Sequence, residues 1–354
     1  MLAPSKTGRQ STYCNALTTA LEMQLHYQRY FQKNTEAQLT IRLLFALWIF
    51  AAPALSAQPY PNKPVKLVVP FGAGSATDTV ARQVGQLLSE ALGQQFIVDN
   101  KAGANGSIGA EFVAKSAPDG YTLIMSTNTP HAANPSLMKK INYDPVKDFV
   151  PIARVANIPF VLVVNNDVAA KSLNELIALV RMQPGKYSYA SGSSGSIISG
   201  AALASGAKIE LLHVPYKSIP PGLTDVIGGQ VSMIFADLVT GLPQIKAGKV
   251  RALAVTSAES SPMLPGVPTM GSAVKGFELV AWFALFAPAN TPTDIVKRLN
   301  AEVVKALARP DMKEKLAASG LSVQTSTPEQ LAAFQKLEIA KWAAMVKDAG
   351  IQPE

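Results

Sequence analysis

From about residue 60 onward, short apolar runs alternate with stretches in which apolar residues recur every three or four positions. The run VKLVV at 65–69 has the length of a strand, and from about Thr79 to Leu92 the spacing is helical until Gly93 ends it. The next runs, FIVDN and YTLIMST, do not alternate with polar residues, which is typical of strands covered on both faces. The pattern predicts an α/β protein with a largely parallel sheet.

Two long extended stretches, near 157–165 and 280–288, bracket a second series of strands and helices that begins at Ser172. This arrangement predicts two α/β lobes joined by two crossing strands, the second lobe being inserted in the first. The expected boundaries are residues 58–160 and 280–354 for lobe 1 and residues 161–279 for lobe 2.

The start of the chain has the layout of a secretory signal. Arg42 precedes an apolar stretch from Leu43 to about Ala52, and small residues then lead to Gln58. The stretch is too short for a permanent membrane anchor, and a buried core helix is the alternative. We expect residues 1–57 to be a leader, with the signal at about 42–57, and the mature protein to be periplasmic. The upstream segment is long for a leader, and a start at Met23 would account for that.

Composition and charge argue against several classes of function. The 354 residues carry a formal net charge of +8, but the basic residues are scattered, so a nucleic-acid partner is not expected. The single cysteine, Cys14, falls in the leader, and the remaining histidines, His131 and His213, have no metal-binding spacing. We therefore expect no cofactor and no metal.

The loop PFGAGSATD, at 70–78, joins a predicted strand to a predicted helix. Gly72 and Gly74 allow backbone angles closed to other residues, and Thr77 or Asp78 can cap the helix while earlier N–H groups stay free for an anion. No Gly-Lys-Ser/Thr follows, and a GxGxxG match breaks at Thr77, so nucleotide binding is the weaker interpretation. A plain βα turn remains the alternative.

Two further loops rich in hydroxyls and amides follow predicted strands, STNTPHAANPSL at 126–137 and YASGSSGSIISG at 189–200. Ligands of open parallel sheets bind at the carboxyl ends of strands, so the three loops predict one cleft. Asp237, after another strand, could accept a hydrogen bond from a ligand ammonium or hydroxyl. His131 is either a contact or a solvated loop residue, and His213 is expected to be structural.

Nearly all of the chain after the leader resembles the Bug receptors, the periplasmic solute-binding components of tripartite tricarboxylate transporters. The resemblance rests on PFGAGSATD, NKAGANGSIGA, APDGYTL, YDPVKDFVPIA, HVPYK, LPQIKAGKVRALAVTS and SPMLPGVPT, in the family's order and spacing. It implies a type II periplasmic binding protein fold, a small organic carboxylate as ligand, membrane transporter components as partners, a monomer and no catalysis.

The resemblance also implies a ligand site built largely from backbone groups of the first loop and of the Tyr-Ala-Ser loop. Asp78 is interpreted as a helix cap that aims the N–H groups, because its own charge would repel a carboxylate. The expected site residues are Phe71, Ala73, Ser75, Ala76, Asp78, Asn128, Ser191, Gly192, Ser193, Gly195, Ser196 and Asp237.

The chain departs from the usual pattern of the Bug receptors at two places that affect ligand specificity. The first loop has Gly72 and Ala73 where the family usually has prolines, and the segment after Ser191 is about two residues short. Loss of bulkier polar side chains there would admit a larger or more apolar solute, so a dicarboxylate, an amino acid and an aromatic acid stay open as ligands.

Two other functions compete with a transport receptor. A secreted serine hydrolase would use Ser193 or Ser194, although no G-x-S-x-G elbow is present. A ligand sensor for a signalling partner would bind the same solutes without supporting uptake.

Overall fold

The computed structural model describes residues 22–33 and 60–353. Contacts divide the chain into two compact units, Met1–Gln58 and Pro59–Glu354. In the first unit residues 22–33 form a helix, and the predicted signal at 42–57 lies outside the described residues. None of the helices in the described ranges is long and apolar enough to cross a membrane.

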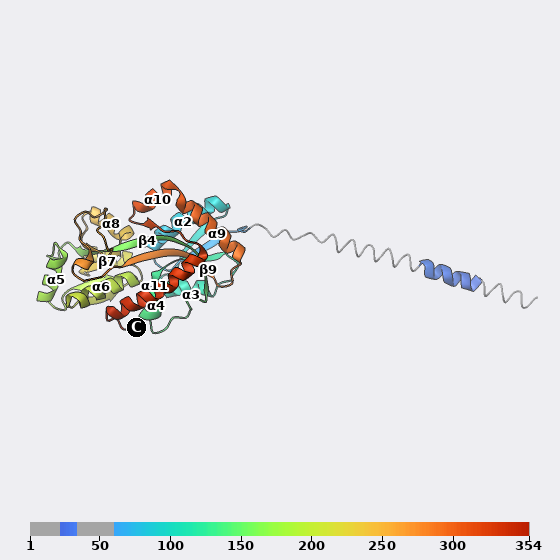
Figure 1. The fold of residues 1–354 in the computed structure, drawn as a ribbon. Helices are drawn as coiled ribbons and strands as arrows, with labels where there is room; N and C mark the ends of the chain where they lie inside the picture. Colours follow the sequence, from blue (N-terminus) through green and yellow to red (C-terminus); the bar gives the residue numbers. More distant parts are fainter. Residues whose placement is uncertain (1–21, 34–59, 354) are drawn as a thin grey trace, which may run out of the picture. The chain divides into compact units, whose positions relative to one another are not determined.

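The second unit contains a ten-stranded sheet with a shared strand near its middle (Figure 1). Five strands pair in the order β2-β1-β3-β9-β4 to form a first sheet, and β10 pairs with β4 beside them. Their bounds are β1 Val65–Val69, β2 Phe96–Asn100, β3 Thr122–Thr127, β4 Phe149–Asn165, β9 Val280–Pro288 and β10 Ser322–Val323.

A second sheet continues from the last part of β4, in the order β4-β7-β5-β6, with β8 also paired to β4. Its own strands are β5 Ser188–Ser191, β6 Leu212–Pro215, β7 Met233–Asp237 and β8 Val250–Val255. Figure 1 shows β4 running from the region of α2 and α9 toward that of β7 and α8.

Helices follow most strands and cover the sheets. Their apolar faces complete a buried core in which the strand residues Leu67, Leu123 and Phe235 are almost wholly inaccessible to solvent. The helices are α2 Ala76–Leu92, α3 Ser107–Ala114, α4 Asn134–Leu137, α5 Leu173–Met182, α6 Ser194–Ala207, α7 Ile219–Ile227, α8 Leu238–Lys246, α9 Thr293–Ala308, α10 Pro310–Ala317 and α11 Pro328–Asp348.

The expected α/β architecture is confirmed, but the expectation of a largely parallel sheet is wrong. β1 pairs in parallel with β2 and β3, and β5 does so with β6 and β7. β4 and β9 instead run antiparallel to their neighbours. A buried antiparallel strand is as continuously apolar as a buried parallel one, so the hydrophobic pattern alone does not reveal strand direction.

Of the two stretches predicted to cross between the lobes, only β4 pairs in both sheets. It pairs with β9 over residues 149–159 and with β7 over residues 160–164. β9 pairs only within the first sheet, so the chain returns from the second sheet just before Val280. The predicted lobe boundaries stay a prediction.

Thr256 ties the two connections together where they pass each other. Its hydroxyl accepts a hydrogen bond from the Phe160 N–H at 2.8 Å and donates one to the Leu279 carbonyl at 2.6 Å. Its N–H donates to the Phe160 carbonyl at 2.9 Å, and the side chain is fully buried. One residue therefore satisfies backbone groups of both connections between the sheets.

Replacing Thr256 by valine should remove the hydroxyl with little change of shape. The buried Phe160 N–H and Leu279 carbonyl would lose a partner, which costs about 1–3 kcal/mol of the free energy of unfolding. Urea unfolding followed by circular dichroism measures the change. The control Thr256→Ser keeps the hydroxyl and should lose less, and an equal loss in both variants would contradict the assignment.

Candidate functional site

A cavity lies between the two sheets, at the place where the register of the strands brings polar loop ends together. Thr127 at the end of β3 is opposite Phe283 of β9, and Phe160 of β4 is opposite Asp237 at the end of β7. All four line the cavity. The full lining is Phe71, Ser75, Ala76, Thr77, Thr127, Asn128, Thr129, Ile158, Phe160, Gly192, Ser193, Ile219, Asp237, Ala281 and Phe283.

The first loop reaches the cavity through the start of α2. Ser75 is the N-cap, and its hydroxyl accepts a hydrogen bond from the Asp78 N–H at 3.3 Å. The N–H groups of Ala76 and Thr77 precede the first intrahelical bond and have no acceptor in the part of the chain that the structure describes. Both residues line the cavity, so the positive end of α2, with two free donors, lies at the cavity.

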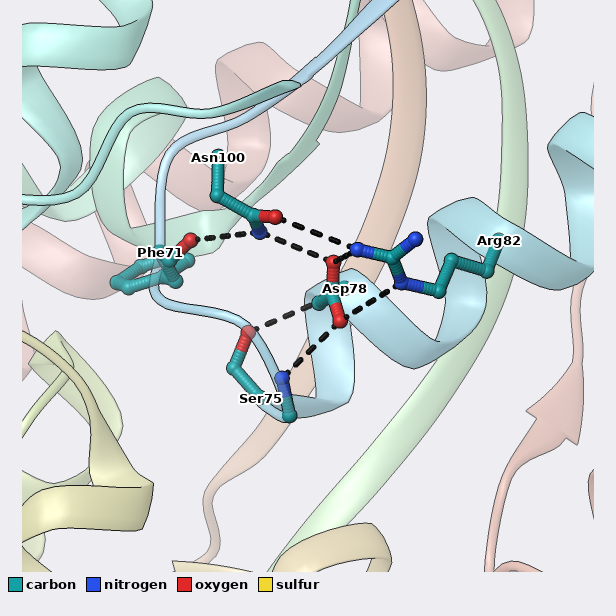
Figure 2. A network of polar contacts seen from close by, with 6 residues as sticks. Phe71, Ser75, Asp78, Arg82 and Asn100 are labelled. Atoms are coloured by element: carbon teal, nitrogen blue, oxygen red, sulfur yellow. Dashed lines mark hydrogen bonds and ion pairs between the residues drawn. The ribbon is translucent and has the colours of Figure 1, made fainter. Parts of the chain in front are cut away.

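Asp78 is not the helix cap, which corrects the sequence interpretation. Its carboxylate accepts from the Gly74 N–H at 3.0 Å, from Asn100 at 2.9 Å and from Arg82 at 3.0 Å (Figure 2). Burial by itself raises the pKa of the Asp78 carboxyl, but these hydrogen bonds outweigh it and hold the pKa below its usual value. Asn100 also donates to the Phe71 carbonyl at 3.0 Å, so Asp78 and Asn100 together hold the loop from behind.

The start of α6 forms the facing wall. Ser193 is its N-cap and lines the cavity, while Ser196 accepts hydrogen bonds from the Gly192 and Ser193 N–H groups. A side chain on Gly192 would overlap the backbone of Ser218, and one on Gly195 would overlap the ring of Phe160. Glycine at these two positions thus lets α6 begin close to the cavity and to β4.

Hydrogen bonds bridge the two sides of the cavity at Ser194. Its hydroxyl receives a hydrogen bond from Asn128 at 2.8 Å and lies 2.9 Å from the Thr129 hydroxyl, and its N–H donates to that hydroxyl at 3.2 Å. Ser194 is fully buried, and Asn128 and Thr129 nearly so. The loop after β3 and the start of α6 are therefore joined directly.

Asp237 lines the cavity as the N-cap of α8. Its carboxylate accepts from the Thr240 N–H at 2.9 Å and from the Thr240 hydroxyl at 3.0 Å. Burial raises the pKa of Asp237 to about 6, and the hydrogen bonds from Thr240 limit the rise. Ile219, in the first turn of α7, completes this side, so four helices, α2, α6, α7 and α8, begin at the cavity.

Comparison with known proteins identifies this architecture. Residues 80–351 match the family model described as the tripartite tricarboxylate transporter family receptor. The chain belongs to this receptor family. Protein BugT of Bordetella pertussis is 38% identical over 322 residues, which cover 87% of this chain and 98% of BugT.

Three solved structures are close to this receptor. Rpa4515 of R. palustris, with adipate, has a TM-score of 0.81 at 36% identity, and the match covers 83% of this chain and 100% of that one. The periplasmic binding protein BugD gives 0.80 at 36% identity, with 83% and 100% covered. MatC from Rhodopseudomonas palustris, with bound malate, gives 0.77 at 35%, with 81% and 100% covered. The fold is that of a type II periplasmic binding protein.

The structure brings seven of the twelve expected site residues to the cavity. The other five lie behind or beside it: Asp78 and Ser196 hold loops, Gly195 packs on Phe160, and Ala73 and Ser191 are not in the lining. The seven in the lining are Phe71, Ser75, Ala76, Asn128, Gly192, Ser193 and Asp237. Their role in ligand binding stays a prediction.

Ser191 instead lies beside a second hollow of about 380 Å³, which shares Ser193 with the cavity. Its hydroxyl is 2.6 Å from His213 Nε2, and the His213 ring stacks on Tyr189. Ser191 is the last residue of β5. Because side chains alternate along a strand, that of Ser191 lies at the second hollow and not in the cavity that Gly192 lines. A structural role for His213 agrees with these contacts.

Some of the lining could not be found from the sequence. Thr127 and Thr129 belong to a loop that the sequence singled out, but Ile158, Phe160 and Phe283 are strand residues with no signal beyond hydrophobicity. They reach the cavity because β4 and β9, which pair with each other, both contribute to its lining. Within residues 22–33 and 60–353, no three His, Cys, Asp or Glu side chains are grouped to hold a metal ion.

His131 is neither a ligand contact nor a solvated loop residue. It is fully buried, its Nδ1 lies 2.7 Å from the Ser126 hydroxyl, and its ring stacks on Phe286 at 4.1 Å between centroids. Burial lowers the pKa of His131 to about 3, so the imidazole is neutral in the folded protein.

The NMR signals of the His131 ring should therefore not titrate between pH 8 and pH 5. An unfolded histidine titrates near 6.5, so the stabilisation from this neutral ring is complete above that pH and is lost as the pH falls toward 3. Below pH 6.5 this group lowers the free energy of unfolding by up to about 1.4 kcal/mol per pH unit. His26→Gln and His213→Gln variants assign the signals, and a His131 midpoint near 6.5 would contradict the burial argument.

Proposed function

We propose that this chain is an extracytoplasmic receptor that captures a small organic carboxylate between its two sheets for uptake by a tripartite tricarboxylate-type transporter. One observation carries the proposal: four helices begin at a cavity whose lining contains no lysine or arginine. Free N–H groups and helix dipoles at such a place favour an anion. The adipate and malate in the related structures are anions of this class.

Capture requires the two sides of the cavity to separate. The cavity has a volume of about 40 Å³, far below the several hundred Å³ of ordinary ligand pockets, so a solute would enter only after the two walls move apart. The proposed motion is a hinge at β4 and Thr256 between lobe 1, residues 58–160 and 280–354, and lobe 2, residues 161–279. A solute stabilises the closed form only by its greater affinity for it.

The remaining parts of the proposal follow from the family. Receptors of this family are periplasmic binding proteins, and a cleaved N-terminal signal would deliver this one to the periplasm. It would act there as a monomer, without catalysis, and would present its closed, liganded form to membrane components of the transporter.

Ser193→Asp tests the site by placing a negative charge at the start of α6. Aspartate caps a helix as well as serine does, so the fold should be retained. Repulsion between two charges about 4–5 Å apart costs roughly 3–4 kcal/mol at an effective dielectric constant of about 20. Affinity for a carboxylate found by calorimetric screening should fall at least a hundredfold.

Two matched variants control for capping and for net charge. Ser193→Asn keeps the cap without the charge, and Ser172→Asp adds the same charge at the cap of α5, outside the cavity. Both should bind within about threefold of the wild type. Unchanged affinity in Ser193→Asp would remove this cavity as the site.

The contact between Ser191 and His213 favours one rival, a secreted serine hydrolase. The sequence nominated Ser193 or Ser194 as nucleophile, but the first caps α6 and the second bonds Asn128 and Thr129. Ser191, with its 2.6 Å contact to His213 beside the larger hollow, is the better-placed serine.

Turnover of p-nitrophenyl acetate by the wild type and by Ser191→Ala distinguishes the two functions. A receptor should show no turnover that depends on Ser191 and should bind carboxylates in both proteins. Turnover lost in Ser191→Ala would support the hydrolase. A sensor would bind the same solutes but would fail to restore uptake in a deletion strain.

A further inference from the structure

One side chain in the cavity is out of keeping with a site for anions. Asp237 is the only ionisable residue in the lining, and it is buried. The Thr240 N–H and hydroxyl both donate to its Oδ1, and the backbone N–H groups of Asp237 and Val239 also stabilise the carboxylate, but all of these donors are uncharged. No ion pair in the described part of the chain includes Asp237.

The position of Asp237 has an electrostatic consequence for a bound solute. The free N–H groups of Ala76 and Thr77 attract a carboxylate from the α2 side, while Asp237 presents a second negative charge from the start of α8. Two anions in one buried cavity repel strongly unless a proton or a cation lies between them. The cavity offers no protein side chain for that role.

We propose that Asp237 selects a solute that carries an ammonium group together with the carboxylate held at α2, that is, an amino acid. The inference rests on the proposed function. The ammonium supplies a further hydrogen-bond donor together with the positive charge that Asp237 lacks. A hydroxyl supplies the donor without the charge, and a plain carboxylic acid supplies neither, so the expected order of affinity is amino acid, hydroxy acid, unsubstituted acid.

The pH dependence of the affinity for an amino acid should reflect the ionisation of the Asp237 carboxyl. The residues that face it from β4, β9, α2, α6 and α7 are uncharged, as the lining shows. Charged residues on the elements around it are engaged elsewhere, outside the lining: Arg154 of β4 bonds Asn157, and Asp225 of α7 accepts from Tyr216. Arg251 of β8 donates to the Val168 and Ala170 carbonyls. Asp78 bonds Arg82 behind the loop, and Lys246 is at the far end of α8.

Since the pKa of Asp237 is about 6, its carboxyl gains its charge between pH 5 and pH 7.5. An amino acid keeps both of its charges over this range, so any change in its affinity comes from the protein. Affinity for the amino acid should rise with pH across this interval.

The test uses two sets of acids with matched skeletons. One is succinate, malate and aspartate, and the other is butyrate, 2-hydroxybutyrate and 2-aminobutyrate. Calorimetry at pH 7.5 on the mature protein should show the amino member of at least one set binding ten times or more tighter than the unsubstituted member. The amino member is then measured again at pH 5, where it should bind more weakly.

Asp237→Asn removes the charge while keeping a good helix cap, and thermal unfolding confirms that the variant is folded. In this variant the preference for the amino member should shrink to less than threefold and its pH dependence should disappear. Asp225→Asn makes the same change of net charge outside the cavity and should behave as the wild type.

The outcomes separate this inference from the proposed function. If the acids bind without the expected order, or if Asp237→Asn leaves the order unchanged, the receptor stands and the role of Asp237 is overturned. If none of the six acids binds, the inference is overturned, while the proposed carboxylate site is decided separately by the calorimetric screen and by Ser193→Asp.

Discussion

The starts of four helices at one buried cavity are the feature on which the rest of this molecule depends. Helix N-termini concentrate unpaired N–H groups and partial positive charge, and they do so without a flexible cationic side chain. The caps Ser75 and Ser193 fix where two of these helices begin, and Asp78 and Asn100 hold the first loop from behind. In the proposed function, selectivity for an anion is thereby built from the backbone.

The same construction couples the cavity to the connection between the sheets. β4 contributes Phe160 to the cavity and pairs in both sheets, while Thr256 bonds Phe160 and Leu279 where the chain returns. The bonds from Asn128 and Thr129 to Ser194 join the two walls directly. A change in the separation of the walls must therefore break buried hydrogen bonds, which a solute or water has to replace.

Much of the fold and part of the site could be predicted from local patterns. The strand at 65–69, the end of α2 at Gly93 and the cap at Ser172 depend on neighbouring residues only, and the structure has each of them. The N-cap of α2 was expected at Thr77 or Asp78, but it is Ser75. PFGAGSATD offers several possible capping residues, and Asn100 and Arg82 engage Asp78 elsewhere. Ser191 lies at the second hollow rather than in the lining of the first cavity, because its direction depends on the pairing of β5.

The sequence by itself determined which segments are strands and helices, and it placed donor-rich loops at their junctions, because backbone propensity, capping and hydrophobic period are local properties. The tertiary structure alone decided that β4 and β9 run antiparallel, that Phe160 and Phe283 form part of the cavity and that His131 is buried. These depend on residues more than a hundred positions apart along the chain coming together, and no local pattern encodes that pairing.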